Sequence, residues 1–133
     1  MDTQQNEEKS DFQKTEELKS KIEKQIAGAV WIQTLGVFLE AVLLEKLKEL
    51  SEEYNEGEEI ALTGAWIQFL GLVTEGAGDT QEAFKSSLPF NFEGQPVAII
   101  GNWLQSLGSA LKAVGGEKVY LNDLLTRETD FVE

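Results

Sequence analysis

One short element occurs three times in this chain of 133 residues, and it constrains the fold more than any other feature. The three copies read AVWIQTLG, GAWIQFLG and GNWLQSLG, and they contain all three tryptophans, Trp31, Trp66 and Trp103. Repeats at spacings of 35 and 37 residues are typical of helical repeat proteins. Each copy supplies one long helix rather than a hairpin. We therefore expect three helices that close on one another rather than an open solenoid.

The apolar pattern predicts an all-α fold, a three- or four-helix bundle with an internal threefold sequence repeat. Residues 1–10 are polar without an apolar period, so they are predicted to be a disordered acidic N-terminus. Residues 11–133 are predicted to form a single helical domain, with repeat helices at about 29–54, 58–76 and 96–114.

Glycine and proline set most of the predicted boundaries. The stripe of Leu18 and Ile22 lies on a different helix face from the stripe that follows Trp31, which predicts a kink or break near Gly28. The sequence DTQE predicts a short separate helix before a proline-rich loop that contains Phe90 and Phe92. Two adjacent glycines, 115 and 116, predict the end of the third helix. The tail beyond them is either a short strand with a helical turn or an extended segment.

The tryptophans are interpreted as core anchors, with an aromatic ligand site as the alternative. In the third helix the predicted core face consists of Trp103, Leu104, Leu107, Ala110, Leu111 and Val114. The second helix is apolar nearly all round, so it needs cover on a second face from the N-terminal arm, the loop at 90–92 or another copy of the protein. The candidate interface on that face is Ala65, Phe69 and Leu72.

Each repeat also carries a row of small residues and a row of polar residues. Gly36, Gly71 and Gly108 each follow a tryptophan by five residues. Ala29, Gly64 and Gly101 lie seven residues, or two helical turns, before these three glycines. Small rows predict close helix crossing, and the alternative is a row left bare for a ligand or partner helix. The candidate polar ladder consists of Gln33, Gln68, Gln105, Glu40, Glu75 and Lys112. It is either a solvated face or a buried network, in which Lys112 would lie between the two glutamates.

Composition excludes several classes of function. The net charge of −13 argues against binding to nucleic acid or to an anionic membrane surface, and it favours a basic partner if the partner is charged. Cysteine and histidine are both absent, which removes the usual thiol nucleophile, general base and metal ligands. No phosphate-binding, dinucleotide or hydrolase motif occurs. We therefore predict no enzyme, no catalytic residue, no cofactor and no metal.

The N-terminus is polar and acidic and does not read as a signal peptide. The nearly uncharged run from Ile26 to Leu44 contains Glu40, and a central carboxylate is costly in lipid, so the run is not predicted to span a membrane. A cytoplasmic location is expected, with signal-independent export left open.

The phrases WIQxLG and NWLQSLG resemble a G-x-W-I-Q-x-x-G element repeated in uncharacterised small proteins of Bacillus-type spore-forming bacteria. The resemblance covers about 40 residues in three pieces. It implies a helical bacterial protein and brings no activity, site or cofactor with it.

Three functions remain open from the sequence. The first is a non-enzymatic helical interaction or structural module that self-associates through the second helix. The second is an acidic immunity or antitoxin-like protein that binds a basic partner through the glutamates between Glu45 and Glu59. The third is a membrane-active protein that opens and inserts its apolar helices. An enzyme built on Glu40 and Glu75 comes last.

Overall fold

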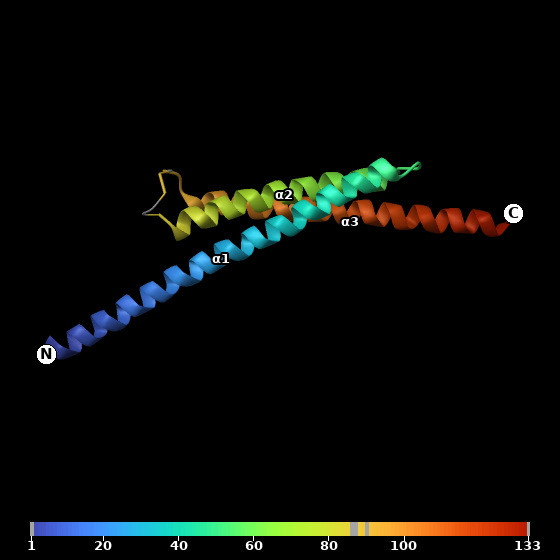
Figure 1. Ribbon diagram of the computed structural model, residues 1–133. Coiled ribbons are helices and arrows are strands. Elements are labelled where there is room, and N and C mark those ends of the chain that lie inside the picture. Colours follow the sequence, from blue (N-terminus) through green and yellow to red (C-terminus); the bar gives the residue numbers. More distant parts are fainter. Residues whose placement is uncertain (1, 86–87, 90, 133) are drawn as a thin grey trace.

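The computed structural model describes residues 2–85, 88–89 and 91–132, and these form three helices without a strand (Figure 1). Helix α1 spans Asp2–Leu50, α2 spans Glu56–Ala83 and α3 spans Gly94–Val132. The all-α prediction is confirmed, and the molecule is a three-helix bundle.

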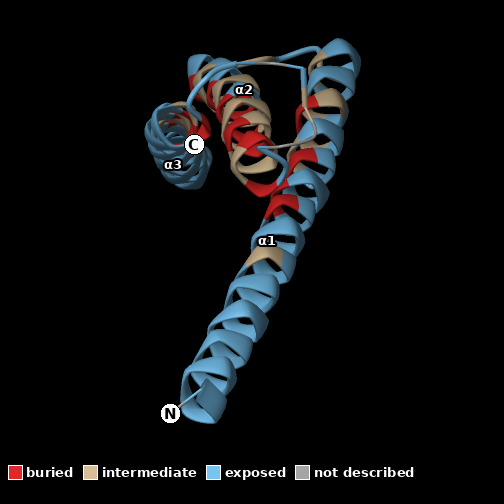
Figure 2. Ribbon diagram, turned by 90° about the vertical axis from the view of Figure 1, so that its left-hand side faces the viewer, coloured by how far each residue is buried: buried red, intermediate tan, exposed pale blue. Residues whose placement is uncertain are grey.

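Helix α2 lies between the other two helices. It packs against α1 on one side and α3 on the other, whereas the described backbones of α1 and α3 do not come close to each other. Figures 1 and 2 show the N-terminal half of α1 leaving the bundle at one end, and Figure 1 shows the last turns of α3 continuing past α2 at the other end. The expected closed arrangement is therefore wrong, because only the central helix has a neighbour on two faces.

Helix α1 runs without a break through Gly28 and includes residues 2–10, so both N-terminal predictions differ from the structure. The break was inferred in order to bring two apolar stripes onto one core. In the structure Leu18, Ile22 and Ile26 are exposed, so the first stripe does not need to meet the second. The first ten residues are rich in Gln, Glu and Lys, whose helix propensity allows the helix to continue without tertiary contacts.

Helix α2 begins with a capping box and is longer than predicted. The Asn55 side chain accepts a hydrogen bond from the Glu58 N–H at 2.9 Å, and the Glu58 carboxylate accepts one from the Asn55 N–H at 3.2 Å. The helix continues through DTQE to Ala83, where the Phe84 N–H donates to the Thr80 carbonyl at 3.0 Å. DTQE is thus the last turn of α2 rather than the start of a separate helix.

Helix α3 passes through Gly115 and Gly116 and includes most of the tail, so both alternatives for the tail are wrong. No described glycine has a positive φ, which means that these two residues keep a helical backbone. Gly115 packs against the backbone of Gly57 and Ala61, and this contact carries α3 along α2 to its first turn. Of the loop phenylalanines, Phe92 is exposed and Phe90 lies outside the described residues.

The interior of the bundle is built from small residues. Figure 2 shows that buried positions lie on all three helices and that most of the N-terminal half of α1 is exposed. Leu72 is the largest side chain that is fully buried, and most other buried positions are glycine or alanine. Large apolar side chains, among them Ile32, Leu39, Trp103 and Leu107, lie on the outside. A water-soluble monomer of this size normally shows the reverse distribution.

Candidate functional site

Helices α2 and α3 meet along two rows of glycine that we call the glycine seam. In antiparallel order, Gly57, Gly64, Gly71 and Gly78 of α2 lie opposite Gly115, Gly108, Gly101 and Gly94 of α3. A spacing of seven residues is about two turns of about 3.6 residues, so each row stays on one face of its helix. A β-carbon added to Gly71 would lie 2.5 Å from the Gln105 nitrogen and 2.7 Å from the Gly101 oxygen. Only glycine permits this backbone approach.

The predicted close crossing is confirmed for Gly64, Gly71, Gly101 and Gly108, and it is wrong for Gly36. A β-carbon on Gly36 would meet nothing within 4 Å. Sequence reasoning missed Gly57 and Gly115 as members of the seam, because it treated Gly115 as a helix end and placed Gly57 before the second helix. Their seven-residue spacing from the repeat glycines was the signal that could have identified them.

Five of the six residues in the polar ladder come together beside the seam. Lys112 of α3 donates to the Gln68 side-chain oxygen at 3.2 Å and forms an ion pair with Glu40 of α1 at 2.5 Å. Gln105 donates to the Glu75 carboxylate in a second group. Lys112 thus links all three helices, although its second partner is Gln68 and not Glu75 as predicted. Gln33 is exposed on α1.

Two of the three tryptophans pack between α1 and α2. The Trp31 indole N–H donates to the Thr80 hydroxyl at 2.9 Å, and its ring lies against Gly76. The Trp66 indole N–H donates to the Glu45 carboxylate at 3.0 Å. Trp103 is 75% exposed, so its prediction as a core anchor is wrong. The reason is that α3 turns its glycine face toward α2 and its tryptophan face outward.

The candidate interface on α2 is covered within the chain. Ala65 is 0% exposed and Leu72 is 1% exposed. Phe69 packs against Phe38 of α1, with ring centroids 5.3 Å apart, and against Trp66. The cover that α2 requires is therefore α1, and these three residues do not form a free binding surface.

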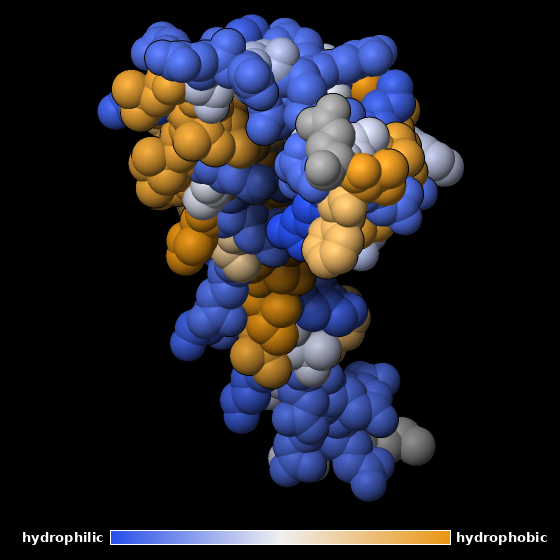
Figure 3. Space-filling view, turned by 90° about the vertical axis from the view of Figure 1, so that its right-hand side faces the viewer, coloured by the Kyte–Doolittle hydropathy of each residue, from blue (hydrophilic) through white to orange (hydrophobic). Residues whose placement is uncertain are grey.

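Two other helix faces are exposed and apolar. The α1 outward face consists of Ile32, Leu35, Gly36, Leu39 and Leu43, and the α3 outward face consists of Ile99, Trp103, Leu107, Ala110 and Val114. The second face contains most of the core predicted for the third helix, so that prediction is wrong. Apolar side chains are visible in large groups on the surface in Figure 3. These two faces are the candidate interaction surfaces of the molecule.

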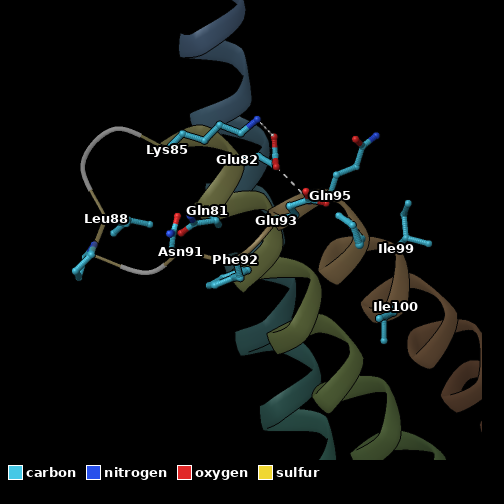
Figure 4. A pocket seen from close by; sticks show the side chains of 12 residues that line it. Gln81, Glu82, Lys85, Leu88, Asn91, Phe92, Glu93, Gln95, Ile99 and Ile100 are labelled. Atoms are coloured by element: carbon cyan, nitrogen blue, oxygen red, sulfur yellow. Dashed lines mark hydrogen bonds and ion pairs between the residues drawn. The ribbon is translucent and has the colours of Figure 1, made fainter.

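An open hollow lies where α2 turns into α3 (Figure 4). Glu82 forms an ion pair with Lys85 at 2.7 Å and accepts a hydrogen bond from the Gln95 N–H at 3.2 Å. The bond to Lys85 is the main cause that lowers the pKa of Glu82. Burial, followed by the charges of Glu75 and Glu82, raises the pKa of the neighbouring Asp79. Among the described residues no group of His, Cys, Asp or Glu is arranged to hold a metal ion.

Stretches of 18 residues in α1 and α2 are long and apolar enough to cross a membrane. Only 22% of the α1 stretch and 33% of the α2 stretch are buried within the protein. Core helices of water-soluble proteins share this length and composition.

No protein-family model matches the chain, and comparisons with curated proteins and with solved structures gave no match. Function must therefore be inferred from the packing and the two outward faces.

Proposed function

We propose that the protein is a non-enzymatic helical module that assembles with further copies of itself through the outward faces of α1 and α3. The observation that carries this proposal is the distribution of side-chain size, with small residues inside and large apolar residues outside. Soluble monomers rarely expose contiguous apolar patches of more than a few hundred Å². Covering both faces would remove this exposed surface from water, which is the main driving force of protein association.

A further copy of the chain is favoured as the partner because the protein already pairs its own repeated elements. The second and third copies of the motif meet in the glycine seam, and the helices that carry the first and second copies pack together through Trp31, Phe38 and Trp66. Gly36 on the α1 outward face is equivalent to Gly71 and Gly108, which are buried in the glycine seam. Trp103 on the α3 outward face is equivalent to Trp66, which packs against α1. The net charge of −13 opposes association of identical chains, so added salt is expected to strengthen the assembly.

The test is the molar mass from light scattering after size exclusion, measured over a range of protein and salt concentrations. The wild type is expected to exceed the mass of one chain, and the mass should rise with protein concentration and with salt. Leu39→Glu on α1 and Trp103→Glu on α3 should each lower it. Gln33→Glu and Ser109→Glu add the same charge to exposed polar positions and serve as matched controls. A single-chain mass for the wild type under all conditions would contradict the proposal.

A membrane-inserted module is the second candidate function, because the same surfaces suit lipid. Helices in lipid associate through small residues, as in the glycine seam, and they pair their polar groups inside the bundle, as Lys112 does with Glu40. This candidate predicts flotation with both neutral and anionic vesicles with helicity retained. Failure to float with either kind removes it, and the expected cytoplasmic location then stands.

The basic-partner function stays a prediction. Several glutamates of the acidic stretch already have partners within the chain: Glu45 binds Trp66, Glu58 caps α2, and Glu59 pairs with Lys48 at 2.8 Å. Salt separates this function from self-association, since salt weakens binding between opposite charges and strengthens binding between like-charged copies.

A further inference from the structure

We propose that two copies of the protein pair through antiparallel α1 helices that cross at Gly36. The first copy of the motif would thereby form, between two molecules, a close crossing at one glycine, where the second and third copies form a row of glycine contacts within the chain. This inference rests on the proposed function of self-association and names the surface that performs it.

The first support is an unpartnered row of five residues on α1, spaced seven residues apart. It consists of Ile22, Ala29, Gly36, Leu43 and Leu50, and every member is exposed. A β-carbon on Gly36 would meet nothing within 4 Å. The residues at the same place in the other two motifs, Gly71 and Gly108, are both buried in the glycine seam. The first motif thus has the same row, without the helix that covers it elsewhere.

The second support is the register of the row. In the glycine seam the first glycine of one row faces the last glycine of the other. When α1 meets a second α1 in the same antiparallel way, its row is symmetric about Gly36. Gly36 then faces Gly36 of the second copy, Ala29 faces Leu43, and Ile22 faces Leu50. A small residue faces a large one on either side of the crossing, and a twofold axis passes through Gly36.

The third support is the exposure and the apolar character of the row. Leu43 of the row is 62% exposed, Ile32 beside the row is 73% exposed, and no residue of the row carries a charge. The apolar row is therefore uncovered in the monomer, and pairing buries it. The α3 outward face differs at its centre, where Trp103 projects and prevents the same backbone approach. The α1 face is accordingly the one that fits a second copy of itself.

Single cysteines test the pairing cleanly, because the wild-type chain contains none. Gly36→Cys is compared with Gly116→Cys, the matched control in which the new side chain also meets open space. Ile22→Cys and Leu50→Cys are tested separately and as a mixture, using a mild oxidant and a short bis-maleimide linker. Circular dichroism confirms that each variant keeps its helices.

Gly36→Cys is expected to form dimers at least about tenfold faster than Gly116→Cys, because pairing raises the local concentration of the two thiols. Ile22→Cys and Leu50→Cys should cross-link efficiently only when they are mixed. If the mixture cross-links and Gly36→Cys does not, the pairing is still supported. In that case the cysteine side chain at position 36 itself obstructs the close approach of the two helices.

Three results would overturn the inference. One is self-cross-linking of Ile22→Cys as fast as the mixture, which indicates parallel helices. Another is that neither Gly36→Cys nor the mixture reacts faster than the control. The third is that these cysteines become shielded from a water-soluble maleimide only when vesicles are added, which assigns the face to lipid. If the wild type is still multimeric by light scattering, self-association survives and the α3 face becomes its site. A monomeric wild type removes both proposals.

Discussion

Helix α2 has two interfaces that differ in kind, although the same repeated motif supplies both. Toward α3 it presents glycine, and the two backbones approach so closely that a single β-carbon would not fit. Toward α1 it presents large side chains, with Trp66 and Phe69 packed around Phe38. The motif therefore has a glycine face and a tryptophan face. α2 covers both faces, α3 buries only the glycine face, and α1 packs its tryptophan face against α2 while Trp31 and Phe38 each stay 39% exposed.

This difference shows that the motif does not determine which of its faces is buried. The position of a helix in the array determines it, because only the central helix has two neighbours. The outer helices consequently expose one face each: α1 exposes its glycine face and α3 exposes its tryptophan face. Substitutions in the two kinds of interface should therefore change the free energy of unfolding by different amounts.

The largest effect is expected in the glycine seam. Gly101→Leu places a side chain against the backbone of Gly71 and Glu75, which cannot move without separating the helices. Overpacking of a core costs about 1–3 kcal/mol, and a backbone clash belongs at or above the upper end of that range. Urea denaturation should therefore show a loss of about 3 kcal/mol or more. Gly116→Leu, which meets open space, is the control and should lose nothing.

The tryptophan face should tolerate change better. Trp31→Phe retains an aromatic ring but removes the N–H that donates to Thr80 at 2.9 Å. The net cost of losing one hydrogen bond of this kind is about 1 kcal/mol. Trp103→Phe changes a ring that is 75% exposed and should lie within about 0.5 kcal/mol of the wild type. Equal losses in the two variants would mean that Trp103 is buried in an assembly at the concentration used.

The smallest effect concerns Asp79, at the end of α2 near the loop to α3. Burial and the charges of Glu75 and Glu82 raise its pKa in the folded state. The folded protein therefore holds this proton more tightly than the unfolded chain, and the ionised form destabilises the fold above that pKa. Asp79→Asn should raise the unfolding free energy at neutral pH. The gain should vanish below the ordinary carboxyl range, where both states of the wild type are protonated.

A urea titration at several pH values measures this dependence. Asp123→Asn removes the same charge from an exposed position on α3 and is the control. A gain that is the same at every pH would show that the ionisation of Asp79 is not its cause.

The sequence predicts the helical class, and it places the start of the second helix at about residue 58, two residues after the observed start at Glu56. The capping box of Asn55 and Glu58 was missed, although their types and spacing favour it. The lengths of α1 and α3 could not be predicted in the same way. Gly28 and Gly115 look like helix ends to any local rule, whereas the structure keeps both in helices, one in open space and the other against α2.

The candidate site was only partly predictable for a similar reason. The polar ladder was predicted in part, since Lys112 does meet Glu40, whereas its other partner is Gln68 and Gln33 stays exposed. The exposure of Trp103 was not foreseen, because an amphipathic pattern shows that a helix has an apolar face and does not show which face its neighbour covers. Glycine rows carry no apolar signal at all. The seam becomes visible in the sequence only when the seven-residue spacing is followed through both helices.

The most direct test of this account is the unfolding free energy of two alanine variants at the same place in two copies of the motif. Gly71→Ala puts a methyl group 2.5 Å from the Gln105 nitrogen, whereas Gly36→Ala puts one in open space. In dilute protein, Gly71→Ala should lose about 1–2 kcal/mol, because overpacking exceeds the gain in helix propensity. Gly36→Ala should gain up to about 1 kcal/mol, because only the propensity changes. Opposite signs are the predicted result, and two gains or two equal losses would contradict the account.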